Sequence, residues 1–278
     1  MLPFLTGSAH ADPPPTNGAL DTVTVEAARE RERLEHRISS FVSSITIPFR
    51  DESLARWQSA ICPLVAGLPP EEGEFVFDRV SRVASDAGVP LAPEKCTPNF
   101  LVVATSDPEA LLQKWWGRSA RLFNEDRGTA GMQRFIHSDQ SVRVWYNACS
   151  VSPGGAKTFK IKGDPSCNTG AIGSRLSFEA VRVIYSVVVV VDLGHIEGLN
   201  VGQLADYIAM IGLAQIRKNP DLGGAPTILH LFAETDAPKP QGLSIWDQTF
   251  LKSLYRTDPA KITQMSEIKF RMGRDLVP

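Results

Sequence analysis

Residues 184–192 are IYSVVVVVD, and residues 201–216, which follow after a short loop, are VGQLADYIAMIGLAQI. Five consecutive valines crowd an α-helix but fit the pleat of a β-strand, so we expect a strand here. Because the valine run is apolar at every position, it predicts a strand that is buried on both faces of a sheet. The second stretch is long and apolar nearly all round, which predicts a helix inside the core.

Weaker patterns on both sides of this unit predict further elements. Helical spacing and helix-start signals predict helices over residues 22–45, 53–66, 71–87, 106–116 and 244–255. Extended patterns predict strands over residues 99–104, 142–146 and 175–182, a short strand or loop over 227–233, and a mixed-charge tail over 261–278. In the helix over 71–87 we expect Phe75, Val80 and Val83 to face inward. Together these elements predict an α+β fold, a mixed β-sheet packed with several helices.

Length and charge limit the domain organisation and the function class. The chain has 278 residues, 43% of them hydrophobic, which suits one compact unit that we place at residues 22–278. The net charge is −2, with 29 basic and 31 acidic residues, so no global charge attracts nucleic acid. In residues 29–37, RERERLEHR, acids alternate with bases, which is typical of a solvated helix face. No apolar run approaches the length of a transmembrane helix.

Residues 1–21 predict the compartment. Ala9-His10-Ala11 is a small-x-small triplet of the kind that ends a secretory signal, and a Pro-rich stretch follows it. The apolar run from Leu2 to Leu5 is short, and no Lys or Arg precedes it. We therefore expect a signal-peptide remnant and a flexible start in an exported protein, periplasmic or secreted. The alternative is a flexible tail.

Four cysteines support export. No two of them have CxxC spacing, which argues against a zinc ribbon or a thioredoxin-type site. In an oxidising compartment the simplest of three connectivities is two local disulfides, Cys62–Cys96 and Cys149–Cys167. The alternative is four buried thiols that pack as small apolar side chains.

Several common catalytic motifs do not occur in the sequence. It has no GxxxxGK[ST], GxGxxG or GxSxG, and its five histidines form no HxH or HxxxH pair. We therefore expect no cofactor and no metal ligand set.

The sequence leaves two candidate sites. His195 and Glu197 in the loop after the valine strand, with Asp206 in the following helix, are weak candidates for acid–base chemistry. Trp115, Trp116, Arg118 and Arg121 form a possible aromatic and basic binding surface; the alternative is a helix end that packs one Trp inward.

The order of the last hundred residues resembles the C-terminal half of metzincin-like zinc peptidases. There a strand precedes a helix that carries HExxH and a Gly-Leu, and a later helix begins near a Ser or Thr with a following Asp and ends in Leu-Tyr. Gly212-Leu213, the segment LSIWD at 243–247 and Leu254-Tyr255 match that pattern. The two histidine positions hold Ala205 and Ala209 instead, and Asp206 stands where the family has its general-base Glu.

The resemblance implies a zincin-like scaffold without zinc, because alanine supplies no metal ligand. The alternative is an unrelated buried helix against a sheet. The blocks ISSFVSSIT, SLARWQSAICPLVAGLP, CTPNFLVVATSDPEALL and LSIWDQTFLKSLY also resemble exported proteobacterial proteins of unknown function. We expect a non-catalytic binding or structural role in the periplasm or cell envelope, with an unknown protein or envelope partner. The alternative is a peptidase-like hydrolase with a non-standard site near His195 and Asp206.

Overall fold

The computed structural model describes residues 17–48, 53–118, 122–123, 128–151, 159–160, 168–169, 181–234 and 237–277. Its centre is a sheet built around β7 (Val181–Asp192). On one side β7 pairs antiparallel with β4 (Val142–Val151). On the other side it pairs parallel with β3 (Phe100–Thr105) and, nearer its start, with β1 (Arg56–Trp57). Strand β2 (Pro63–Ala66) continues the sheet beyond β3, again in parallel. The α+β class with a mixed sheet is therefore confirmed.

The valine run is the predicted central strand. All five valines are fully buried, and their side chains alternate between two apolar cores. Val187, Val189 and Val191 belong to the larger core, while Val188 and Val190 belong to a smaller one on the opposite face. A strand with both faces covered explains why the sequence is continuously apolar rather than alternating.

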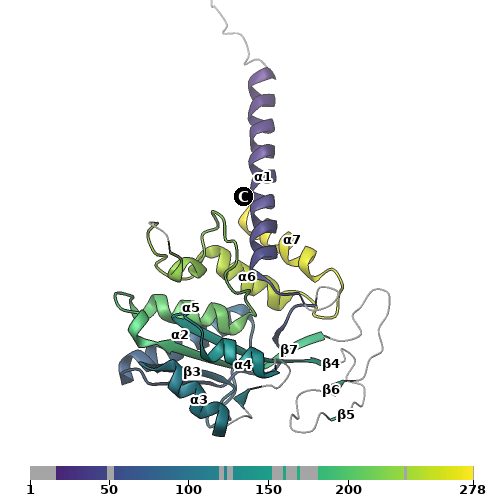
Figure 1. The fold of residues 1–278 in the computed structure, drawn as a ribbon. Helices are drawn as coiled ribbons and strands as arrows, with labels where there is room; N and C mark the ends of the chain where they lie inside the picture. Colours follow the sequence, from purple (N-terminus) through teal and green to yellow (C-terminus); the bar gives the residue numbers. More distant parts are fainter. Residues whose placement is uncertain are drawn as a thin grey trace, which may run out of the picture.

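Helices cover both faces of the sheet (Figure 1). On the larger core lie α2 (Pro70–Ala87) and α5 (Val201–Leu213). On the smaller core lie α3 (Pro108–Arg118) and α4 (Gly128–Ile136). Because the helix after β3 goes to one face and the helix after β7 goes to the other, the carboxyl ends of these two neighbouring strands form a topological switch point, a common place for functional sites.

The larger core extends into a helical layer. It includes α6 (Ile245–Arg256), α7 (Gln264–Leu276) and the last third of α1 (Asn17–Ile45). The first part of α1 projects from the body (Figure 1), and residues 25–33 are exposed. The helix starts at Asn17, five residues before the predicted boundary, and residues 1–16, with the predicted signal remnant, lie outside the described residues.

Several local predictions are wrong. Residues 53–66, expected as a helix, form β1 and β2, because pairing with β7 and β3 outweighs a short helical pattern that contains Pro63. In α2 the inward face is Val76, Val80, Val83, Ala84 and Ala87, and Phe75 is 45% exposed. The predicted tail contains α7, whose Met265, Ile268 and Met272 are buried. Helix α4 had no prediction.

The remaining elements are short. Strands β5 (Phe159–Lys160) and β6 (Asn168–Thr169) form a small antiparallel pair. The 3-10 helices η3 (Leu193–His195) and η4 (Ile228–Phe232) follow β7 and precede α6. Cys62 and Cys96 form the predicted disulfide. Cys149 is also disulfide-bonded, and its predicted partner, Cys167, lies outside the described residues. Within the part of the chain that is described, no helix is long and apolar enough to cross a membrane.

Candidate functional site

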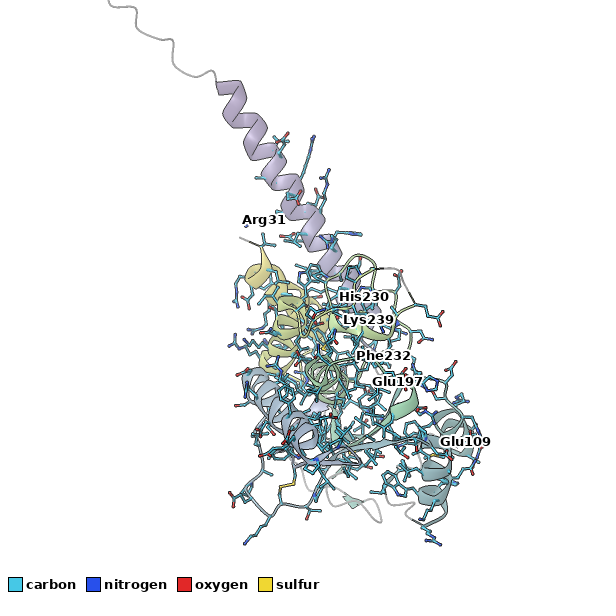
Figure 2. All side chains as sticks on the ribbon, turned by 90° about the vertical axis from the view of Figure 1, so that its left-hand side faces the viewer. Arg31, Glu109, Glu197, His230, Phe232 and Lys239 are labelled. Carbon is cyan, nitrogen blue, oxygen red and sulfur yellow. A yellow bond between two sulfur atoms is a disulfide. The ribbon has the colours of Figure 1, made fainter. Side chains whose placement is uncertain are left out.

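A cleft of about 1100 Å³ opens beside α5. Its walls are the loop over residues 220–227, His230 of η4 and the segment over residues 237–244, and Arg79 of α2 and Asp206 of α5 also line it. Figure 2 shows His230 and Lys239 of these walls on the same side of the molecule. Twelve of the lining residues are Pro, Gly, Ala or Leu, and eight carry polar or charged side chains, a mixture that suits a small-molecule pocket.

Arg79 and Asp206 form a two-pronged ion pair in this cleft. Arg79 Nε donates to Asp206 Oδ1, and Nη2 donates to Oδ2 at 3.0 Å. Asp206 Oδ2 also accepts the backbone N–H of Leu243 at 2.7 Å. The Asp206 side chain is only 4% exposed, against 33% for Arg79. The hydrogen bond to Asp206 raises the pKa of Arg79 above its ordinary value, so the guanidinium stays charged.

The segment over residues 237–243, which we name the strap, is fastened to α5 at two points. Besides the Leu243 bond to Asp206, Gln203 Nε2 donates to the carbonyl of Pro240 at 2.8 Å. Gln203 is itself held by the predicted N-cap, because Asn200 and Gln203 form a reciprocal capping box at the start of α5. Gly242 allows the close approach, since a Cβ there would lie 2.6 Å from Asp206 Oδ2.

Asp247 fixes the opposite wall of the cleft. It is fully buried and accepts hydrogen bonds from Thr227 Oγ1, Ile228 N and Ser244 N. The single hydroxyl proton of Ser244 lies within reach of both Asp247 and the carbonyl of Pro226. Burial raises the pKa of this carboxyl, and the hydrogen bonds oppose that shift. One side chain thereby joins η4 to the first turn of α6, so the wall between Thr227 and Ser244 has a defined shape.

A second polar group lies at the carboxyl edge of the sheet. Asp192 ends β7 beside Thr105, the last residue of β3. Its carboxylate accepts the backbone N–H of Gly194 at 3.0 Å and lies 3.0 Å from His195 Nδ1. Arg143 of β4 lies 4.0 Å from the same carboxylate, and its buried Nε has no hydrogen-bond partner within the described structure. The His195 side chain is 64% exposed.

The structure thus separates the residues that the sequence grouped as acid–base candidates. Asp206 is paired with Arg79 in the cleft, whereas His195 is paired with Asp192 at the sheet edge. Glu197 is exposed, and neither it nor His195 is among the described residues that line the cleft. Figure 2 labels Glu197 below Phe232, His230 and Lys239.

The α5 residues do not fit a zinc site. Ala205 and Ala209, at the positions where the peptidases have histidine, are fully buried in the larger core and do not line the cleft. Asp206 already accepts three hydrogen bonds. No cluster of three or more His, Cys, Asp or Glu side chains that could hold a metal occurs within the described ranges.

The predicted aromatic and basic surface lies at the end of α3, where its tryptophans contact the smaller core. Trp115 and Trp116 are half-buried against the smaller core, and the Trp116 ring lies 6.4 Å from that of Phe123. Arg118 is exposed, and Arg121 lies outside the described residues. The contact of Trp116 with Phe123 agrees with the alternative of a helix end that packs one Trp inward, and the binding surface stays a prediction.

Sequence reasoning missed Arg79, His230 and Lys239 as residues of the cleft. Arg79 pairs with a residue 127 positions away, and no local pattern reports such a contact. The sequence indicated one role of Asp247, because it predicts a capping box between Ser244 and Asp247. That motif does not reveal the bonds of Asp247 to Thr227 and Ile228.

Comparison of the chain with protein-family models, with curated proteins and with solved structures finds no match.

Proposed function

We propose that the protein is a non-catalytic binding protein whose ligand occupies the cleft beside α5. The state of Asp206 carries this proposal. Asp206 stands at the helix position that aligns with the general base of the peptidases, and its carboxylate is the same kind of group. It nevertheless accepts three protein hydrogen bonds and is almost fully buried. A carboxylate in that state is poorly placed to take a proton from a substrate or from water.

The cleft itself supports binding. Its volume of about 1100 Å³ and its mainly apolar lining suit a small organic ligand or a short peptide segment. The Arg79–Asp206 pair and the Asp247 hydrogen bonds hold α2, α5, the strap and η4 in fixed relation, so the cavity is preorganised.

We further propose that the protein works outside the cytoplasm, on an inactive zincin-like scaffold. The Cys62–Cys96 disulfide supports an oxidising compartment. Two of the residues that carry the peptidase resemblance also contact each other, because the Tyr255 hydroxyl donates to the carbonyl of Leu213. The predicted protein or envelope partner stays a prediction.

A neutral dye tests the binding function. We expect N-phenyl-1-naphthylamine to bind wild-type protein saturably, with a fluorescence increase. Gly224→Trp places an indole at the cleft lining, and Gly117→Trp places one on α3; a Cβ at either glycine meets nothing within 4 Å. The first substitution should weaken dye binding about tenfold or more, and the second should leave it unchanged. Absence of saturable binding, or equal binding by both variants, would contradict the proposal.

The Asp192–His195 pair favours a second candidate, a hydrolase. A carboxylate that holds one ring nitrogen of an exposed histidine resembles the pairing of many general bases. This candidate predicts p-nitrophenyl acetate hydrolysis that His195→Ala abolishes and that His36→Ala, a change to an exposed histidine of α1, leaves intact. Equal hydrolysis rates for wild type, His195→Ala and His36→Ala would contradict the hydrolase candidate.

A further inference from the structure

Arg79 lies where three cavities meet. It lines the main cleft, a cavity of about 280 Å³ beside Phe75 and Arg82, and a cavity of about 80 Å³ beside Lys252. Asp206 lines only the first two of them. With a third of its side chain exposed, Arg79 is the charged group that all three spaces share.

Arg79 uses only one edge of its guanidinium within the protein. Nε and Nη2 donate to Asp206, whereas Nη1 donates to no group in the described structure. A planar guanidinium can hold one carboxylate on each of two edges, so the outer edge of Arg79 is left for a ligand.

Two cationic side chains of the main cleft, Arg79 and Lys239, keep donors that no described residue uses. Lys239 is exposed, and its ammonium has no partner among the residues that the structure describes. The acceptors are largely used: Asp206 accepts three bonds, and the hydroxyl oxygens of Thr227 and Ser244 accept the backbone N–H groups of Leu229 and Asp247. Asp221, the other acid of the lining, lies exposed and accepts the N–H of Gly223 within its own loop.

We propose that the ligand of this cleft is a small amphipathic carboxylate. Its anionic head would bind the outer edge of Arg79 and the ammonium of Lys239, and its apolar part would lie along the Leu222, Ala225 and Pro226 wall. Charge-assisted hydrogen bonds to a guanidinium fork are the strong kind, and the apolar wall supplies the remaining affinity. This inference rests on the proposed binding function and names the class of its ligand.

Three probes with one chain length test the ligand class: octanoate, octan-1-ol and octylammonium, each titrated into the full chain by isothermal titration calorimetry. We expect octanoate to bind about tenfold more tightly than octan-1-ol, and octylammonium to bind most weakly. Equal affinities, or tighter binding of octylammonium, would overturn the inference. If the neutral dye binds in the cleft but octanoate has no advantage, the ligand class is wrong and the binding function survives; if neither the dye nor the probes bind, both fail.

Two variants locate the anionic head. Lys239→Met removes a surface charge and keeps the apolar stem, so it should weaken octanoate about threefold to tenfold and leave octan-1-ol unchanged. Lys114→Met, an exposed lysine of α3, is the matched control and should change neither. The double variant Arg79→Gln/Asp206→Asn removes both charges of the pair and should reduce the preference for octanoate about threefold or more, since only Lys239 then holds the head. If that variant does not fold, Lys239→Met decides: unchanged octanoate binding would contradict the assignment.

Discussion

Asp206 in the cleft and Asp192 at the sheet edge are both buried carboxylates that hold a basic side chain, but they leave that side chain in different states. Asp206 accepts a two-pronged bond from Arg79 and a backbone N–H, and it ties together α2, α5 and the strap. Asp192 fastens its own loop and lies 4.0 Å from Arg143 of β4, and its partner His195 remains mostly exposed. The comparison indicates that the first carboxylate shapes a cavity, while the second holds an exposed ring that lines none of the described pockets.

The largest expected effect comes from Asp206→Ala. Removing a buried carboxylate leaves the Arg79 charge and the Leu243 N–H without their partner, which should lower the free energy of unfolding by about 2–3 kcal/mol, allowing for the partial exposure of Arg79. Urea denaturation measures the loss. Asp221→Ala, the exposed acid of the same cleft, is the control and should cost less than about 0.5 kcal/mol. A loss below about 1 kcal/mol for Asp206→Ala would show that the pair does not organise the cleft.

A smaller effect is expected from Gly242→Ala. The added methyl group would lie 2.6 Å from Asp206 Oδ2, so the strap or the ion pair must shift. We expect a loss of about 1–2 kcal/mol, measured by thermal or urea unfolding. Gly273→Ala in α7 should instead stabilise by about 0.5–1 kcal/mol, because its Cβ meets nothing and alanine favours a helix. The same sign for both changes would mean that the strap is not closely seated on Asp206.

Asp247, in the wall of the cleft, should make the free energy of unfolding depend on pH. Its folded pKa is raised by burial above the ordinary value, so the folded state binds the proton more tightly than the unfolded state does. The contribution of Asp247 to the free energy of unfolding therefore falls as pH rises from the ordinary aspartate pKa toward the raised one. The fall is about 1.4 kcal/mol for each pH unit between the unfolded and folded pKa. Asp247→Asn should remove this slope from urea midpoints measured between pH 4 and 7. If wild type and variant have the same slope, the carboxyl does not titrate as described.

The smallest effect is expected at the other carboxylate. His195→Ala should change the free energy of unfolding by less than about 0.5 kcal/mol, because the ring is mostly exposed and its pair is solvated. Chemical denaturation of this variant beside Asp206→Ala measures the contrast between the two regions directly. A cost above about 1 kcal/mol would place His195 in the framework of the fold rather than at its surface.

Local sequence patterns predicted the elements that are specified by their own residues, through composition or capping. The valines at 187–191 specify a two-sided strand, and Asn200 and Ser244 cap α5 and α6 as expected. The pattern over residues 53–66 failed because β1 and β2 are held by pairing with distant strands, which no local periodicity reports. Helix α7 was missed because its charged residues hide a narrow apolar stripe.

The candidate site was harder to predict than the fold. Asp206 was identifiable from its place in the helix, but its meaning changed once Arg79 from α2 and Leu243 from the strap were known as partners. His195 was grouped with Asp206 because both follow the valine strand; the structure gives it Asp192 instead. Partners far apart in sequence decide whether a carboxylate is available for chemistry, and only the folded arrangement shows them.

A ¹H–¹⁵N correlation spectrum, recorded while N-phenyl-1-naphthylamine is added, tests the central claim most directly. Binding in the cleft predicts that the amide shifts gather in its lining, at Gly223, Gly224, Gln241 and Leu243, while Gly194 and His195 at the sheet edge keep their positions. Shifts centred on Gly194 and His195, or spread evenly over the protein, would contradict the assignment of the cleft as the binding site.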